Sequence, residues 1–107
     1  MNRSKRIGKW DITNHAVVRC KQRVGDPLVN NRTATEIRRM ISHSLSDVNF
    51  SRVIETRRDI YYPISFHYKK HHFGPYYCVA RSSEPSTILT LLGEEEFSKL
   101  RYNRGTN

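Results

Sequence analysis

The sequence is poor in cysteine, in acidic residues and in long hydrophobic runs, and each shortage excludes a class of protein. Its 107 residues include two cysteines, Cys20 and Cys78, which excludes a disulfide-rich scaffold. Both lie in apolar patterns that are typical of buried free thiols, with a single disulfide as the alternative. No apolar segment approaches the roughly 20 residues that cross a bilayer, and no apolar stretch of a secretory signal follows the basic segment 1–6. The sequence has no internal repeats, so we expect a single domain. The free thiols predict a cytoplasmic location, and the lack of a long apolar segment predicts that no membrane is a partner.

What the sequence does contain is an excess of positive charge. Nineteen Lys and Arg residues against ten Asp and Glu residues give a net charge of +9, and the isoelectric point is about 10.0. Such an excess attracts polyanions, and phosphate contacts release counterions on binding. The charge therefore predicts a nucleic acid as the partner, with a solubility charge that has no partner as the alternative.

Hydrophobic periodicity and turn residues predict an α+β fold. We expect a flexible basic arm over residues 1–10 and a single domain over residues 11–107. The domain should have two N-terminal helices packed on an antiparallel sheet of about four strands, plus a short C-terminal helix. The helices are predicted at residues 14–24, 33–46 and 94–102, and the strands at 52–56, 60–68, 76–81 and 87–92. A hairpin loop is expected at residues 69–75.

Caps and side-chain patterns add detail to these elements. Thr13 is a suitable N-cap for the first helix, and Thr33–Glu36 has the capping-box pattern of the second. In the second helix Arg38 and Arg39 should point away from the core. Two adjacent tyrosine pairs lie in the strands, Tyr61–Tyr62 and Tyr76–Tyr77. In each pair we expect one buried and one exposed ring, because side chains alternate along a strand.

The first predicted helix carries the pattern with the most chemistry. His15, Arg19 and Arg23 recur every four residues, so they should share one face beside the apolar stripe. Arginine holds phosphate oxygens with two hydrogen bonds, and histidine exchanges a proton near neutral pH. This face therefore suits work on a phosphodiester. The alternative is a structural histidine in the first turn, followed by solvated arginines.

The stretch Thr13–Arg23 resembles the His-Ala-x-x-Arg-x-x-x-Arg signature of small bacterial and phage domains. These domains are grouped with the barnase, EndoU, colicin tRNase and RelE-like ribonuclease superfamily. His15, Ala16, Arg19 and Arg23 match the opening signature, and Thr90 matches a threonine in the final strand. The order of elements fits over about residues 11–93, whereas the basic loops are longer than in the family and the C-terminal helix lies beyond its usual end.

That resemblance implies a function and roles for the matching residues. The activity would be that of a toxin-like, metal-independent endoribonuclease, in which a ribose 2′-hydroxyl attacks the adjacent phosphate. His15 would transfer the proton, Arg19 and Arg23 would clamp the phosphate, and Thr90 would donate or accept a hydrogen bond. RNA would be the partner, and neither a cofactor nor a metal is expected.

Further basic and aromatic residues are candidates for nucleic-acid binding. They are Lys21, Arg52, Arg57, Lys69, Lys70, His71 and His72. Lysine charge and aromatic rings together suit phosphate contact and base stacking, whereas exposed polar loops and solvated turns are the alternative. A zinc site from His67, His71 and Cys78 lacks any accompanying metal-binding motif. The three glutamates at residues 94–96 suit the start of a helix, where the dipole favours negative charge.

Two other functions are compatible with the sequence. One is a non-catalytic binding module, such as a phage or bacterial inhibitor of a host nucleic-acid-processing complex. An acidic protein that mimics nucleic acid, such as an antitoxin, is a candidate partner for either this module or the ribonuclease. The other is DNA binding by a helix-turn-helix pair, which is disfavoured because the loop at residues 26–32 exceeds the usual turn of three or four residues.

Overall fold

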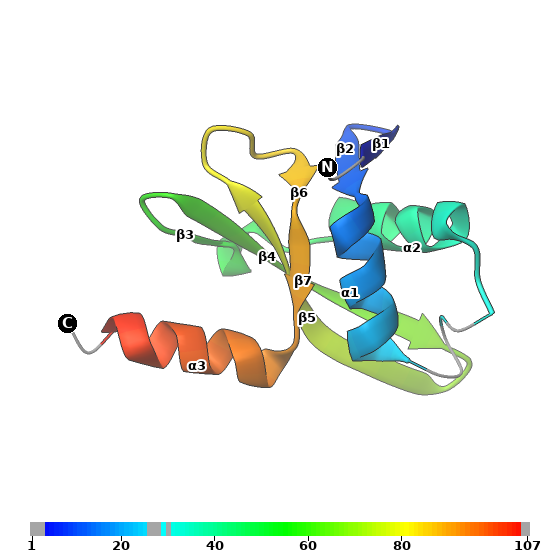
Figure 1. Ribbon diagram of the computed structural model, residues 1–107. Helices are drawn as coiled ribbons and strands as arrows, with labels where there is room; N and C mark the ends of the chain where they lie inside the picture. The colour runs from blue at the N-terminus through cyan, green and yellow to red at the C-terminus, as the bar shows by residue number, and fades with distance from the viewer. Residues whose placement is uncertain (1–3, 26–28, 30, 106–107) are drawn as a thin grey trace.

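The computed structural model describes residues 4–25, 29 and 31–105, and it confirms the α+β class (Figure 1). The helices are α1 (Asn14–Val24), α2 (Ala34–Ser46) and α3 (Glu94–Gly105), with a short 3₁₀ helix at Phe50–Arg52. The strands are β1 (Ser4–Ile7), β2 (Trp10–Thr13), β3 (Ile54–Glu55), β4 (Asp59–Tyr68), β5 (His71–Arg81), β6 (Thr87–Ile88) and β7 (Thr90–Leu92). None of the helices in the described part of the chain has the length and hydrophobicity that crossing a bilayer requires.

The strands form two sheets where the sequence predicts one. The four-stranded sheet is antiparallel in the order β3-β4-β5-β7, and the three-stranded sheet has the order β1-β2-β6, with β2 and β6 parallel. The predicted strand at residues 87–92 is therefore divided between the two sheets. The division falls at Leu89, whose N–H donates to the Val79 carbonyl at 2.8 Å.

The prediction of a flexible arm at the N-terminus is wrong for residues 4–10, which form a hairpin. Strand β1 pairs with β2 in antiparallel register, from Ser4 opposite Thr13 to Ile7 opposite Trp10. The hairpin is anchored because Trp10 is buried and the Ser42 hydroxyl donates to the Ile7 carbonyl at 3.1 Å. Residues 1–3 lie outside the described part of the chain.

The predicted hairpin loop at residues 69–75 is also wrong, because the strands continue almost to the tip. Tyr68 pairs with His71, so the turn consists of Lys69 and Lys70 alone. Lys69 has a φ of 56°, which completes the turn in the left-handed region. A tight turn places the basic residues of this segment on a paired ribbon and not on a long loop.

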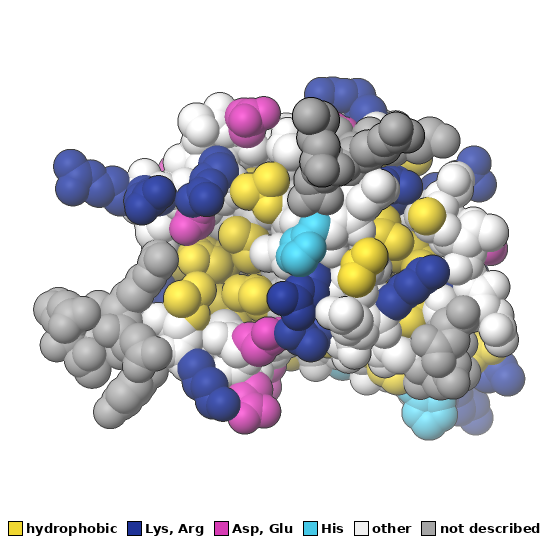
Figure 2. Space-filling model, in the orientation of Figure 1, with side chains coloured by type: hydrophobic (Ala, Val, Ile, Leu, Met, Phe, Trp, Pro, Cys, Tyr) yellow, Lys and Arg dark blue, Asp and Glu magenta, His cyan; other side chains and the backbone are white. Residues whose placement is uncertain are grey.

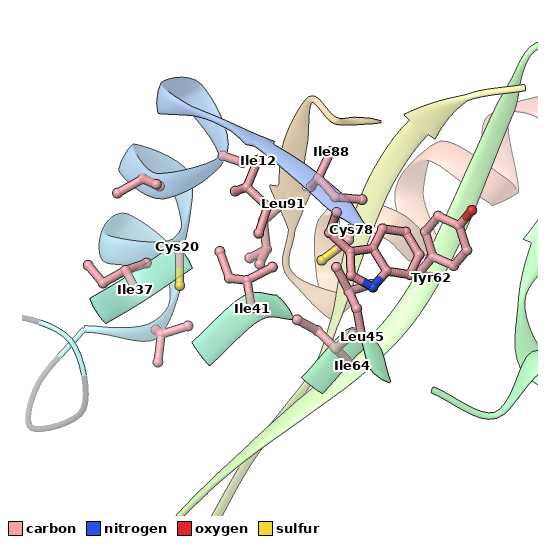
Figure 3. Packing of buried hydrophobic residues seen from close by; sticks show 14 of the residues in the cluster. Ile12, Cys20, Ile37, Ile41, Leu45, Tyr62, Ile64, Cys78, Ile88 and Leu91 are labelled. Atoms are coloured by element: carbon pink, nitrogen blue, oxygen red, sulfur yellow. The ribbon is translucent and has the colours of Figure 1, made fainter. Parts of the chain in front are cut away.

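The first two helices and the large sheet share one hydrophobic core (Figure 3). Helix α1 contributes Ala16, Val17, Cys20 and Val24, as its apolar stripe predicts, and α2 contributes Ile37, Ile41 and Leu45. Cys20 and Cys78 are fully buried free thiols. Burial raises the pKa of Cys20 to about 12 and that of Cys78 well above its ordinary value. Both thiols therefore stay protonated and unreactive in the native fold.

Arg38 was expected to point away from the core, and it is buried instead. Its Nε donates to the Ile12 carbonyl at 3.0 Å, and its Nη2 donates to the Asn14 side chain. The guanidinium thus joins α2 to the junction of β2 and α1. Arg39 is exposed, as predicted.

The outer face of the large sheet is covered by α3, which changes the tyrosine pattern. Phe97 of α3 stacks on Tyr77 with ring centroids 3.9 Å apart, and its ring meets the edge of Tyr61 at 5.2 Å. Tyr61 is therefore buried like Tyr62, although the two side chains point to opposite faces. The expectation of one exposed ring is wrong for this pair because it assumed an uncovered outer face.

Candidate functional site

Helix α1 is held beside β7 by its own N-cap (Figure 1). The Thr13 hydroxyl accepts from the Ala16 N–H at 3.1 Å and donates to the Leu89 carbonyl at 3.1 Å. One hydroxyl can do both because it is a donor and an acceptor. The cap therefore sets the start of the helix and the point at which the chain leaves β6 for β7.

The exposed side of α1 carries an imidazole and a guanidinium in contact. His15 and Arg19 lie one turn apart, and the Arg19 Nε donates to His15 Nε2 at 3.5 Å. The Arg19 Nη1 donates to Gln22 at 3.3 Å. A neutral imidazole has one nitrogen that can accept a hydrogen bond or a proton, so the group can serve as a general base. Figure 2 shows histidine and basic side chains together near the middle of this face, in the region where Figure 1 draws α1 and β7.

Arg23, the third residue of this row, is bound to a carboxylate. Its Nε and Nη2 donate to Oε1 and Oε2 of Glu96 at 2.5 Å and 2.6 Å. Glu96 also accepts from the Gly93 N–H at 3.0 Å. The hydrogen bonds from Arg23 and Gly93 lower the pKa of the Glu96 carboxyl, and the bond to Glu96 raises the pKa of Arg23. Both groups are therefore charged at neutral pH, and the two-donor fork of Arg23 faces Glu96.

Thr90 lies in the same seam between α1 and β7. The residue before it, Leu89, binds the cap of α1. At the other end of β7, a Cβ on Gly93 would lie 4.0 Å from Arg23 Cδ. The helix and the strand therefore run side by side in the same direction, which places Thr90 near the first turn of α1, where His15 lies. Four of the five residues that match the family signature therefore lie on two neighbouring elements: His15, Arg19 and Arg23 on α1, and Thr90 on β7.

The other predicted nucleic-acid residues occupy four separate places, and all are exposed. Lys21 lies on α1 itself, and residues 69–72 form the tip of the β4–β5 hairpin. Arg52 ends the 3₁₀ helix, and Arg57 lies in the turn between β3 and β4. Because β3 and β7 are opposite edges of the sheet, Arg52 and Arg57 do not extend the seam.

The structure does not assemble the zinc alternative. Cys78 is fully buried in the core, whereas His67 and His71 are exposed on the hairpin. Among residues 4–25, 29 and 31–105, no three His, Cys, Asp or Glu side chains cluster in a way that suits a metal ion.

Glu96 is the residue of this site that sequence reasoning missed. The three glutamates do occupy the first turn of α3, as helix-start electrostatics predict. Glu96 has the additional role of binding Arg23, 73 positions away in the chain. Its spacing after Gly93 was the available signal. Gly93 precedes the helix, and a Glu three residues after such a capping position commonly accepts a hydrogen bond from its N–H. No sequence signal linked it to Arg23.

No protein-family model, curated protein or solved structure matches this chain. The case for its function therefore depends on the residues of the seam.

Proposed function

We propose that this chain binds RNA along the seam between α1 and β7 and cleaves it without a metal ion. A ribose 2′-oxygen forms a bond to the adjacent phosphorus, and the bond from phosphorus to the 5′-oxygen breaks. The products are a 2′,3′-cyclic phosphate and a 5′-hydroxyl. His15 takes the proton from the 2′-hydroxyl and returns one to the leaving 5′-oxygen, so the protons balance.

One observation carries this proposal: His15 and Arg19 are in contact on the accessible side of α1, the helix that lies beside the strand of Thr90. Arg19 brings permanent positive charge to the histidine, which favours phosphate binding and stabilises charge that develops on the phosphate oxygens. The net charge of +9 adds long-range attraction for RNA.

Arg23 has a different role from that of Arg19 in this proposal. Its fork is occupied by Glu96, so Arg19 makes the first phosphate contact. Arg23 contacts the RNA only after a phosphate replaces the carboxylate. The ion pair thereby weakens binding of RNA while it holds α3 in place.

The direct test is cleavage of a short RNA in EDTA. We expect products that end in a 2′,3′-cyclic phosphate, and no cleavage of the same oligonucleotide with a 2′-deoxyribose at the scissile position. Cleavage of the deoxy substrate, or a requirement for a divalent metal, would exclude attack by the 2′-hydroxyl as the mechanism.

A second candidate is an RNA-binding module without chemistry. It is favoured by the Arg23–Glu96 pair, which leaves Arg19 as the one arginine of the row for the phosphate. This candidate predicts salt-sensitive binding with no product on a gel. Each phosphate contact then contributes a slope of about −0.7 in a plot of log K against log salt concentration. Recovery of one host nucleic-acid complex with the inactive protein would support it.

A further inference from the structure

A groove of about 480 Å³ lies between α2 and β4, apart from the seam. It exists because β3 is short: Ile54 and Glu55 pair with Tyr61 and Ile60, and the rest of β4 extends past them. The second half of α2 runs along this uncovered edge. Since β4 and β7 are separated by β5, the groove and the α1–β7 seam are two different places on the molecule.

The edge of β4 in this groove is unsuited to pairing with another strand. The Thr56 N–H donates to the Asp59 carbonyl, so the backbone groups of Asp59 point towards the β3 side. Backbone groups alternate in direction along a strand, so those of Tyr61 and Pro63 point to the same side. Pro63 has no N–H to donate there. Two residues further, the Ser65 carbonyl already accepts from the Ser44 hydroxyl at 3.1 Å. An extended peptide would therefore find few main-chain partners in the groove.

The lining has the chemistry that a nucleotide needs. Met40, Val48 and Pro63 supply apolar surface, and Tyr68 and His67 supply rings. Aromatic rings stack on bases without regard to sequence. The volume is within the range of about 300–1,000 Å³ that small-molecule sites have.

A permanent cation, Arg32, lies in the lining of the same groove, and Asp47 is its one carboxylate. Arg32 Nη1 lies 3.8 Å from Oε2 of the exposed Glu36, and His43 Nε2 lies 3.9 Å from Asp47 Oδ2. The Lys69 ammonium lies 5.5 Å from the centre of the Tyr68 ring, so a cation of the hairpin tip adjoins it. A ligand with a flat ring and a negatively charged group matches this combination of apolar, aromatic and cationic side chains.

We infer that the groove between α2 and β4 binds one nucleotide of an RNA strand, with its base against Tyr68 and its phosphate beside Arg32. The inference extends the proposed function, since it gives the RNA a second contact site away from His15. It does not require cleavage.

Titration of the ¹⁵N-labelled chain followed by NMR tests the location. With adenosine 5′-monophosphate we expect the largest shifts at the amides of residues 43–47 and 65–68. Inorganic phosphate alone should produce much smaller shifts there. Equal shifts with phosphate would show that the groove binds anions without recognising the base. Shifts confined to α1 and β7 would place the nucleotide at the seam. Either result overturns the inference, as does binding of a hexaglutamate peptide without a response to the nucleotide.

Two matched pairs of variants test the lining. His67 and His72 face each other across the β4–β5 ladder with ring centroids 4.7 Å apart, and of the two His67 lines the groove. We expect His67→Ala to weaken nucleotide binding about fivefold or more, and His72→Ala to leave it nearly unchanged. Likewise, His43→Ala should weaken binding more than Arg39→Ala, although the arginine carries the permanent charge. Equal effects within each pair would show that the nucleotide responds to the overall charge of the chain and not to the groove.

These outcomes separate the groove from the proposed cleavage. Cleavage of RNA by a chain whose groove ignores nucleotides would leave the function standing and remove the groove. Nucleotide binding in the groove of a chain that cuts no RNA would support the groove and exclude the proposed cleavage.

Discussion

The Arg23 guanidinium and the Glu96 carboxylate form a pair of hydrogen bonds that joins the last turn of α1 to the first turn of α3. The pair sits beside the row of His15 and Arg19, so it affects both stability and the site. It fixes α3 at the end of β7. It also occupies the arginine fork that a phosphate would otherwise bind.

Glu96→Gln should release Arg23 for RNA. We expect tighter RNA binding, by about threefold to tenfold, because a competing carboxylate is removed. Stability should fall by about 1 kcal/mol, since the two side chains are partly exposed and solvent screens the pair. Glu95→Gln is the matched control, because Glu95 pairs with Lys99 and not with Arg23. Filter binding and urea unfolding measure the two effects. Weaker RNA binding by Glu96→Gln than by Glu95→Gln would show that Glu96 helps the site.

The same pair predicts how stability depends on pH. The pKa of Glu96 is lowered in the folded chain, so its contribution is present above the unfolded pKa of about 4.3 and is lost as the pH falls through the folded pKa. The difference in free energy of unfolding between wild type and Glu96→Gln should therefore vanish at the acidic end of a series from pH 6 to 3. A difference that is constant across the series would mean that the carboxylate does not titrate as part of this pair.

Arg38 should stabilise the fold through its buried hydrogen bonds and not through its positive charge. Arg38→Ala removes a buried donor from the Ile12 carbonyl and from Asn14, so we expect a loss of about 2–3 kcal/mol in the free energy of unfolding. Arg39→Ala removes the same charge from an exposed position and should change stability by less than about 0.5 kcal/mol. Urea unfolding distinguishes the two, and comparable effects would contradict the buried role.

Phe97 should determine whether α3 docks on the sheet. Phe97→Ala removes the ring that stacks on Tyr77 and covers Tyr61, so we expect the amides of α3 to lose protection in hydrogen exchange. Amides in the middle of α1 and α2 should keep theirs, because the core of those helices does not include Phe97. Phe97→Leu retains apolar contact and should keep partial protection. Unchanged exchange in α3 after Phe97→Ala would show that other contacts hold it.

Local signals in the sequence predicted the helices well. Thr13 and the Thr33–Glu36 capping box set the starts of α1 and α2 as expected, because caps are satisfied within a few residues. The row of His15, Arg19 and Arg23 followed from helical spacing alone. Both features depend on neighbours along the chain.

The errors arose where distant segments meet. The basic composition of residues 4–10 concealed a hairpin that pairs with the chain and is fixed by Ser42 of α2. The split at Leu89 depends on Val79 and Thr13, which lie in other elements. The sequence indicates that Arg38 and Glu96 are surface charges. Their hydrogen-bond partners, Asn14 and Arg23, are distant in the chain and become neighbours only in the fold. Periodicity carries no information about such partners.

The rate of RNA cleavage by His15→Ala, measured beside wild type in EDTA under single-turnover conditions, tests the central claim most directly. We expect a loss of about 10²–10⁴-fold with an unchanged melting temperature, because His15 moves the proton and lies exposed on α1. His71→Ala, at the hairpin tip, should change the apparent affinity for RNA and not the rate at saturation. Cleavage by His15→Ala at the wild-type rate would contradict the assignment of the site to the α1–β7 seam.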